Sequence, residues 1–136
     1  MKKISLILLA TLALTSITAL AAPISVSGHI SLSPKFKSKV SADDTLYIIA
    51  RAVNGPHMPL AVFRAKADIL PFVYVLNDSM AMSPEMKLSD FDQVVVVARI
   101  SKSGDPMPHP GDLEVVSRVV QPGTTGIDLT IDKVVK

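Results

Sequence analysis

The sequence has no cysteine and no tryptophan among its 136 residues, and few aromatic side chains of any kind. The lack of cysteine excludes disulfide bonds and thiol redox chemistry by this chain itself. The fold must therefore be held together by an apolar core alone. Glycines are also scarce, and because they never cluster, they do not form the phosphate-binding loop of a nucleotide-binding protein.

A strong charge of either sign is missing as well. Fourteen lysines and arginines stand against twelve aspartates and glutamates, which gives a formal net charge of +2 at pH 7. We expect Lys2 and Lys3 to be removed with an N-terminal signal peptide, and the remaining charges then balance. A nucleic-acid-binding protein normally keeps a basic surface, so we expect no nucleic-acid partner.

The N-terminus has the pattern of a secretory signal peptide. Basic residues come first, residues 4–14 are apolar apart from one serine and one threonine, and the small-x-small cleavage rule is met at Ala21. Cleavage one residue later would place Pro23 next to the scissile bond, where its ring fits poorly. The apolar run is too short for a membrane span, which needs roughly 20 apolar residues. We therefore predict a signal peptide (residues 1–21) and one soluble domain (residues 22–136) exported to a bacterial periplasm.

Short apolar runs separated by turn residues make up the rest of the chain and predict an all-β domain. Residues 24–32 alternate between apolar and polar side chains, as in a strand with one buried face. Residues 45–53 and 93–100 are apolar almost throughout, as in strands covered on both faces. The seven predicted strands are residues 24–32, 45–53, 58–66, 70–76, 93–100, 113–120 and 127–135. They predict an antiparallel seven-stranded Ig-like β-sandwich, although the lack of tryptophan and cysteine argues against a true immunoglobulin domain.

Residues for catalysis are not grouped in any recognisable pattern. The chain has no G-x-S-x-G motif, and its three histidines stand in unrelated contexts. Carboxylate pairs occur at residues 43–44 and at Asp90 and Asp92, but acids in turns usually cap nearby backbone amides. We therefore expect a protein that is not an enzyme and has no cofactor.

The longest interruption between predicted strands is the segment 77–92, which holds three of the six methionines. If the strands alternate in direction, this segment leaves the sandwich at the same end as the loop 54–59, and Met107 and His109 leave at the opposite end. Loops at the ends of a sandwich are where such folds place recognition residues. The predicted partner-binding residues are His57, Met58, Met80, Met82, Met86 and Phe91.

Two interpretations of these methionines are open. Thioether and imidazole groups are ligands that Cu(I) prefers, so one alternative is a periplasmic copper carrier. Its ligands would be His57, Met58, Met80, Met82 and Met86. In the other interpretation Met80 and Met82 fill the open end of the sandwich as flexible apolar side chains, or the methionines contact a partner protein. The spacing of the methionines does not decide between the two.

Five segments together, in this order and spacing, resemble a known family. They are GHISLSP (28–34), DDTL through ARA (43–52), GPHMPLAV (55–62), DSMAMSP with MKLS (78–89) and ARISKSG with PGDLE (98–114). They are similar to the C-terminal periplasmic domain of the cytochrome c-type biogenesis protein called CcmI or CycH. The resemblance extends over about residues 24–135, nearly the whole predicted mature chain.

The resemblance implies an Ig-like domain in a system that holds apocytochrome c and delivers it for covalent haem attachment. It therefore predicts a protein partner, either apocytochrome c or the haem-ligation complex, and an accessory or chaperone-like role. In full-length relatives this domain follows membrane helices and a tetratricopeptide array, whereas a predicted signal peptide stands in their place here. The resemblance assigns no catalytic or ligand residue.

Overall fold

The computed structural model describes residues 24–55 and 58–136, so the predicted signal peptide and its cleavage site lie outside the described residues. Within the described ranges the chain forms eight strands: β1 (Ser25–Leu32), β2 (Thr45–Ala52), β3 (Pro59–Lys66), β4 (Phe72–Asn77), β5 (Val94–Ser101), β6 (Leu113–Val116), β7 (Leu129–Ile131) and β8 (Lys133–Val134). Short 3-10 helices connect some of them: η1 (Pro34–Lys39), η2 (Ala67–Ile69), η3 (Asp78–Met80) and η4 (Leu88–Asp90). No helix in this part of the chain is long and apolar enough to cross a membrane.

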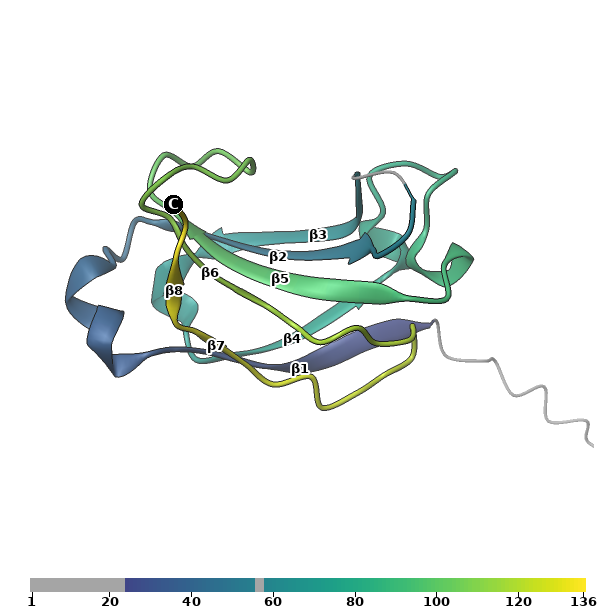
Figure 1. Ribbon diagram of the computed structural model, residues 1–136, viewed down its shortest axis with the longest axis horizontal. Helices are drawn as coiled ribbons and strands as arrows, with labels where there is room; N and C mark the ends of the chain where they lie inside the picture. The colour runs from purple at the N-terminus through teal and green to yellow at the C-terminus, as the bar shows by residue number, and fades with distance from the viewer. Residues whose placement is uncertain (1–23, 56–57) are drawn as a thin grey trace, which may run out of the picture.

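The strands form two sheets that pack face to face (Figure 1). The smaller sheet has the order β4-β1-β7, and the larger has the order β3-β2-β5-β6-β8. Neighbouring strands are antiparallel in every pair except β1 and β7, which run parallel. The predicted Ig-like all-β sandwich is confirmed, and the parallel pair is a departure from the antiparallel arrangement that we expected.

The last predicted strand, residues 127–135, divides into two short strands in the structure. Its first part, β7, pairs with β1 in the smaller sheet, and β8 pairs with β6 in the larger sheet. The chain therefore crosses from one sheet to the other at Asp132. Strands that change sheets in this way close the corners of a sandwich. An alternating pattern shows which face of a strand is buried but not which strand it pairs with. The sequence therefore predicts one strand over residues 127–135, and seven strands in all, where the structure has two short strands in different sheets.

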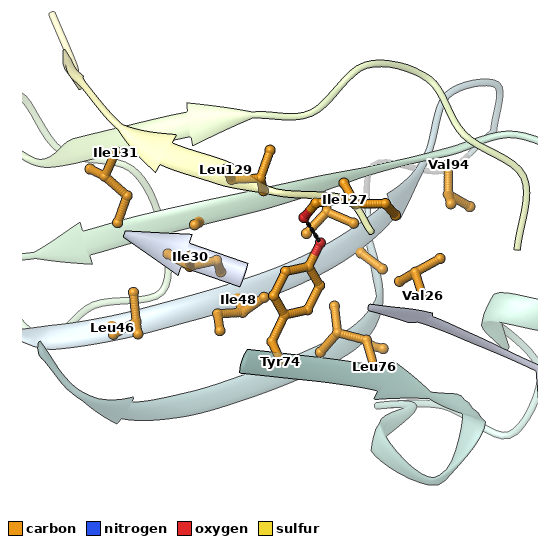
Figure 2. Packing of buried hydrophobic residues seen from close by; sticks show 14 of the residues in the cluster. Val26, Ile30, Leu46, Ile48, Tyr74, Leu76, Val94, Ile127, Leu129 and Ile131 are labelled. Atoms are coloured by element: carbon orange, nitrogen blue, oxygen red, sulfur yellow. Dashed lines mark hydrogen bonds between the residues drawn. The ribbon is translucent and has the colours of Figure 1, made fainter. Parts of the chain in front are cut away.

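The core lies between the two sheets (Figure 2). Its largest fully buried side chains include Val26, Ile30, Leu46, Ile48, Tyr74, Leu76, Ile100, Ile127 and Ile131. Each apolar side chain of this size stabilises the fold by about 1.5–3 kcal/mol when it leaves water. The hydroxyl of Tyr74 donates a hydrogen bond to the backbone oxygen of Ile127 across 2.8 Å, drawn as a dashed line in Figure 2. A cysteine-free core of this kind is what the composition requires.

The loops that join the strands gather at the two ends of the sandwich. The β2–β3 and β4–β5 connections lie at one end, because Ala52 at the end of β2 pairs with Val94 at the start of β5. The loop between β5 and β6 (residues 102–112) begins at the opposite end, where Ser101 pairs with Thr45. In Figure 1 this loop turns back over the larger sheet.

Candidate functional site

We call residues 53–55, 58 and 78–93 the loop end. The strand directions place the β2–β3 and β4–β5 connections together there, as the alternation of strands predicts. Met107 and His109 belong to the loop between β5 and β6, which leaves the sandwich at the opposite end, also as predicted. His57 lies outside the described residues.

The β4–β5 connection is held in shape by its own polar side chains. The side-chain oxygen of Asn77 accepts a hydrogen bond from the backbone N–H of Ser79 at 2.9 Å. The carboxylate of Asp78 accepts two more from Ser89, from its backbone N–H at 3.1 Å and from its hydroxyl at 2.5 Å. The carboxylate of Asp90 accepts one from the backbone N–H of Lys87 at 3.1 Å. Asp78 and Ser89 lie eleven residues apart in sequence. Their contact therefore holds the two sides of the loop together and fixes its conformation.

Phe91 joins the loop end to the core. Its half-buried ring packs against the core and also lies against Gly55, where an added Cβ atom would be 3.3 Å from the Cε1 atom of Phe91. Gly55 has a φ of +138°, a backbone conformation that side chains of other residues rarely adopt. Both the conformation and the close contact therefore favour glycine at this position.

The predicted methionines fall into two groups. Met80 and Met86 are half-buried and pack against the core. The packing interpretation named Met80 and Met82, and of these two only Met80 packs against the core. Met82 and Met58 are 65% and 52% exposed and remain available to another molecule. Among the described residues, no group of three or more histidine, aspartate or glutamate side chains is placed to hold a metal ion. The copper interpretation stays a prediction from the sequence.

A hollow of about 770 Å³ opens beside the loop end. Its wall is formed by residues from four segments: Ile24, Asn54, residues 89–93, and the pair Gln121 and Pro122. Phe91 lies between the exposed carboxylates of Asp90 and Asp92, while Ile24 is 46% exposed. The hollow is therefore mainly polar, with two acidic side chains and a smaller apolar part at Ile24, Phe91 and Pro122.

Sequence reasoning placed Phe91 in the site but missed Ile24, Gln121 and Pro122. These three residues reach the hollow through pairings distant in sequence. Val120 forms an isolated bridge with Val94, and the backbone N–H of Gly123 donates to the oxygen of Ser25 at 2.8 Å. No local pattern signals such contacts, since they depend on which strands become neighbours.

The two ends of the molecule differ in charge. The segment 78–93 contains four carboxylates and a single lysine, Lys87, and is therefore acidic. At the other end η1 presents Lys35, Lys37 and Lys39 and no acid, and all three lysines are exposed. The connections at this end also carry acids, among them Asp43, Asp44 and Asp68, so its charge is mixed, whereas the loop end is acidic.

The Ig-like domain of cytochrome c-type biogenesis protein H is a family whose model matches residues 24–132. The chain belongs to this family. A curated relative, the cytochrome c-type biogenesis protein CycH of Pseudomonas aeruginosa (strain PAO1), is 45% identical over 85 residues, which are 62% of this chain and 21% of the relative. The chain thus spans about a fifth of the length of that relative. No solved structure matches the chain.

The CycH Ig-like match begins at Ile24 and ends at Asp132, the residue at which the chain changes sheets. The whole loop end and every residue that lines the hollow fall inside the matched range, whereas β8 falls outside it. The predicted resemblance is therefore confirmed, and the candidate site belongs to the part of the chain that matches the CycH family.

Proposed function

We propose that this CycH Ig-like domain is a non-enzymatic binding module of the periplasm that assists cytochrome c maturation. Its partner is apocytochrome c or the haem-ligation complex, and its role is accessory or chaperone-like. Membership of the family and the name of the Pseudomonas relative support the process. The predicted signal peptide supports the compartment, and the absence of any catalytic grouping in the sequence supports a binding role.

We propose that the partner binds at the loop end. The observation behind this proposal is the hollow at Phe91, where a ring anchored in the core forms part of an open surface. Loops held by a rigid scaffold are where binding residues concentrate. Methionine suits such a surface because its unbranched thioether chain adapts to different partners, and Met58 and Met82 are exposed here. His57 is included in the proposed surface on the sequence prediction.

An unfolded apocytochrome segment has apolar side chains that are not yet buried. A site that combines apolar surface with exposed carboxylates would hold such a segment when the segment also contains lysine or arginine. Opposite charges on the two partners speed their association and fix their relative orientation. Binding of this kind must be reversible, so we expect a dissociation constant in the micromolar range. This constant corresponds to a favourable binding free energy of about 8 kcal/mol.

The test is a calorimetric titration of the mature chain, residues 22–136, with an apocytochrome c segment and separately with the haem-ligation complex. We expect Met82→Ser to weaken binding about threefold or more, since the complex loses the apolar contact that the methionine side chain would make with the partner. Met107→Ser is the matched control, because Met107 is 66% exposed and Met82 is 65% exposed. The control lies at the opposite end and should bind like the unmodified chain. If neither partner binds at high micromolar concentration, the proposal is wrong.

A further inference from the structure

β4 is an outermost strand of the smaller sheet, because β1 is its one neighbour there within the described residues. Tyr74 and Leu76 point from it into the core, as Figure 2 shows. Val73 and Val75 point to the opposite face, where they are 57% and 47% exposed. β4 is therefore an edge strand with apolar side chains in contact with water.

The register of β1 shows which backbone groups of β4 face away from the sheet. Ser27 directs its backbone away from β4, since its N–H donates to an oxygen of the segment 124–127 at 3.2 Å and its oxygen accepts from an N–H of that segment at 2.9 Å. Bonded and non-bonded pairs alternate along an antiparallel ladder. The pairs of Ser27 with Val75 and of His29 with Val73 are thus of the non-bonded kind. The N–H and C=O groups of Val73 and Val75 therefore point outward, where no segment of the described chain bonds them.

The other edge strands have features that hinder pairing with a further strand. β3 begins at Pro59, has a register shift beside that residue, and presents exposed Arg64 and Lys66. β7 and β8 are only three and two residues long. Prolines, charged side chains, bulges and short length are the means by which natural sheets protect their edges. β4 has six residues, an unshifted register and no charged side chain, so it is the one edge in the described chain without such protection.

Apolar surface also lies beside this edge, between the two sheets. The rings of Phe72 on β4 and Phe63 on β3 stack with their centres 5.2 Å apart, and both side chains are half-buried. A strand added beside β4 would direct alternate side chains toward these rings and the others toward Val73 and Val75. Both faces of such a strand would therefore meet apolar side chains.

We propose that the free edge of β4 binds, by strand addition, an extended segment of another polypeptide that is rich in β-branched apolar residues. The outward N–H and C=O groups require an extended backbone, because a helix already bonds its own backbone groups. The paired part of the segment would match the six residues of β4. The edge is separate from the loop end and does not depend on the function proposed there.

A second copy of this chain fits the edge less well than a single extended segment. β3 lies on the same side of the sandwich as β4, so two copies side by side would bring Arg64 and Lys66 toward the same residues of the other copy. Like charges placed together in this way oppose association. A second copy would also leave the two phenylalanine rings uncovered, since the inward side chains of its own β4 are packed in its own core.

The first test uses a synthetic peptide of alternating valine and threonine with a lysine at each end. It is titrated into the 15N-labelled mature chain, and amide shifts are followed by NMR. Two control peptides carry N-methyl groups on alternate residues, one on the odd and one on the even positions, so that each lacks the hydrogen-bond donors of one side of the strand.

We expect the parent peptide to shift amides of β4 and β1. One control should bind at least about tenfold more weakly, because it loses several backbone hydrogen bonds to β4, and the other should bind like the parent. No binding by the parent, equal affinities of the two controls, or shifts confined to residues 78–93 would overturn the proposal.

The second test changes the edge itself. Val75→Pro removes an outward N–H and places the proline ring where an added strand must approach, while the bonds to β1 stay intact. We expect it to weaken the parent peptide at least about tenfold. Val75→Thr is the control, because it keeps the backbone N–H and should bind as before. Equal affinities of the two variants would contradict strand addition at β4.

If circular dichroism shows that Val75→Pro does not fold, Val75→Lys replaces it, since lysine is a residue that protects natural edges. Its control is Val134→Lys on β8, because Val75 and Val134 are 47% and 44% exposed. We expect only Val75→Lys to weaken the peptide, by about threefold or more. Equal effects of these two variants would likewise count against the proposal.

Sedimentation velocity over a rising concentration series tests for self-association at the same edge. We expect a monomer throughout. A dimer that Val75→Pro or Val75→Lys dissociates would overturn the proposal in favour of a second copy of this chain.

Discussion

Gly28 lies where the backbone of another segment passes too close for any side chain. A Cβ atom added there would be 2.0 Å from the carbonyl oxygen of Ile127. The Ile127 backbone is also held in place, because its N–H donates to the oxygen of Ser27 at 2.9 Å and its oxygen accepts from Tyr74. Glycine is therefore required at this point by close packing of two backbones.

We expect Gly28→Ala to lower the free energy of unfolding by about 1–3 kcal/mol or more, as overpacking of a dense core does. Urea denaturation followed by circular dichroism measures this loss. Ser27→Ala is the control on the adjacent residue of the same strand, and it should change stability by about 0.5 kcal/mol or less. If Gly28→Ala is as stable as the control, the close approach described above is incorrect.

Tyr74 combines a buried ring with a buried hydrogen bond. Burial, and to a smaller degree the charge of Asp128, raises the pKa of its hydroxyl above the ordinary value of 10.0. The neutral form is therefore favoured more strongly in the folded chain than in the unfolded chain. The contribution of this raised pKa to the free energy of unfolding is fully present below pH 10. It is lost as the pH rises above 10.

For Tyr74→Phe we expect a loss of about 1–2 kcal/mol at neutral pH, because the oxygen of Ile127 loses its donor. The variant should also lose less stability than the unmodified chain between pH 9 and pH 11, a range chosen around the ordinary pKa of about 10. Urea midpoints measured across that range provide the check. Parallel pH profiles for the two proteins would show that another group causes the alkaline instability.

Among the connecting elements, the loop 102–112 has the most side-chain anchors. The carboxylate of Asp112 closes its base, since it accepts hydrogen bonds from the backbone N–H groups of Lys102 at 3.1 Å and His109 at 3.0 Å. Tyr47 and Arg99 hold its middle against the larger sheet. Three prolines and two glycines predict a rigid irregular loop from the sequence, but its position over the sheet depends on side chains from two other elements.

We expect Tyr47→Phe to loosen this loop without unfolding the sandwich. The hydroxyl bond to Gly104 is lost, which costs about 1 kcal/mol, while the ring keeps its packing against Ile49 and Val97. Hydrogen exchange should become faster in residues 102–112 and stay the same in β4 on the smaller sheet. Uniformly faster exchange would mean that Tyr47 stabilises the whole fold rather than the loop.

At the level of strands, the sequence predicts the first five within about two residues, because apolar runs and turn residues report burial directly. The predicted strand 113–120 ends early, at Val116, and only Val120 forms a further bridge. Pairing partners, the parallel β1–β7 contact and the crossing at Asp132 are absent from any local pattern. In the candidate site, the sequence does not decide whether Met80 and Met82 pack or bind, since one methionine pattern serves packing and binding alike.

For the whole molecule, composition and strand alternation together are enough to predict a cysteine-free two-layer sandwich. The apolar character of residues 45–53 and 93–100 also predicts cover on both faces, and the structure confirms that these strands are mostly buried. What the sequence does not indicate is how the second face is covered. In the structure the loop 102–112 covers part of that face, and Ile49 and Val97 are buried on it beside Tyr47.

The pairing of β1 with β7 has a consequence for how the chain reaches its native state. The strand nearest the beginning of the domain needs a partner that lies close to its end. Synthesis or translocation that stops short of residue 129 therefore leaves β1 with one neighbour instead of two and leaves the two layers unjoined at β7 and β8. Contacts this distant in sequence form slowly, so we expect the pairing of β1 with β7 to be a late step in folding.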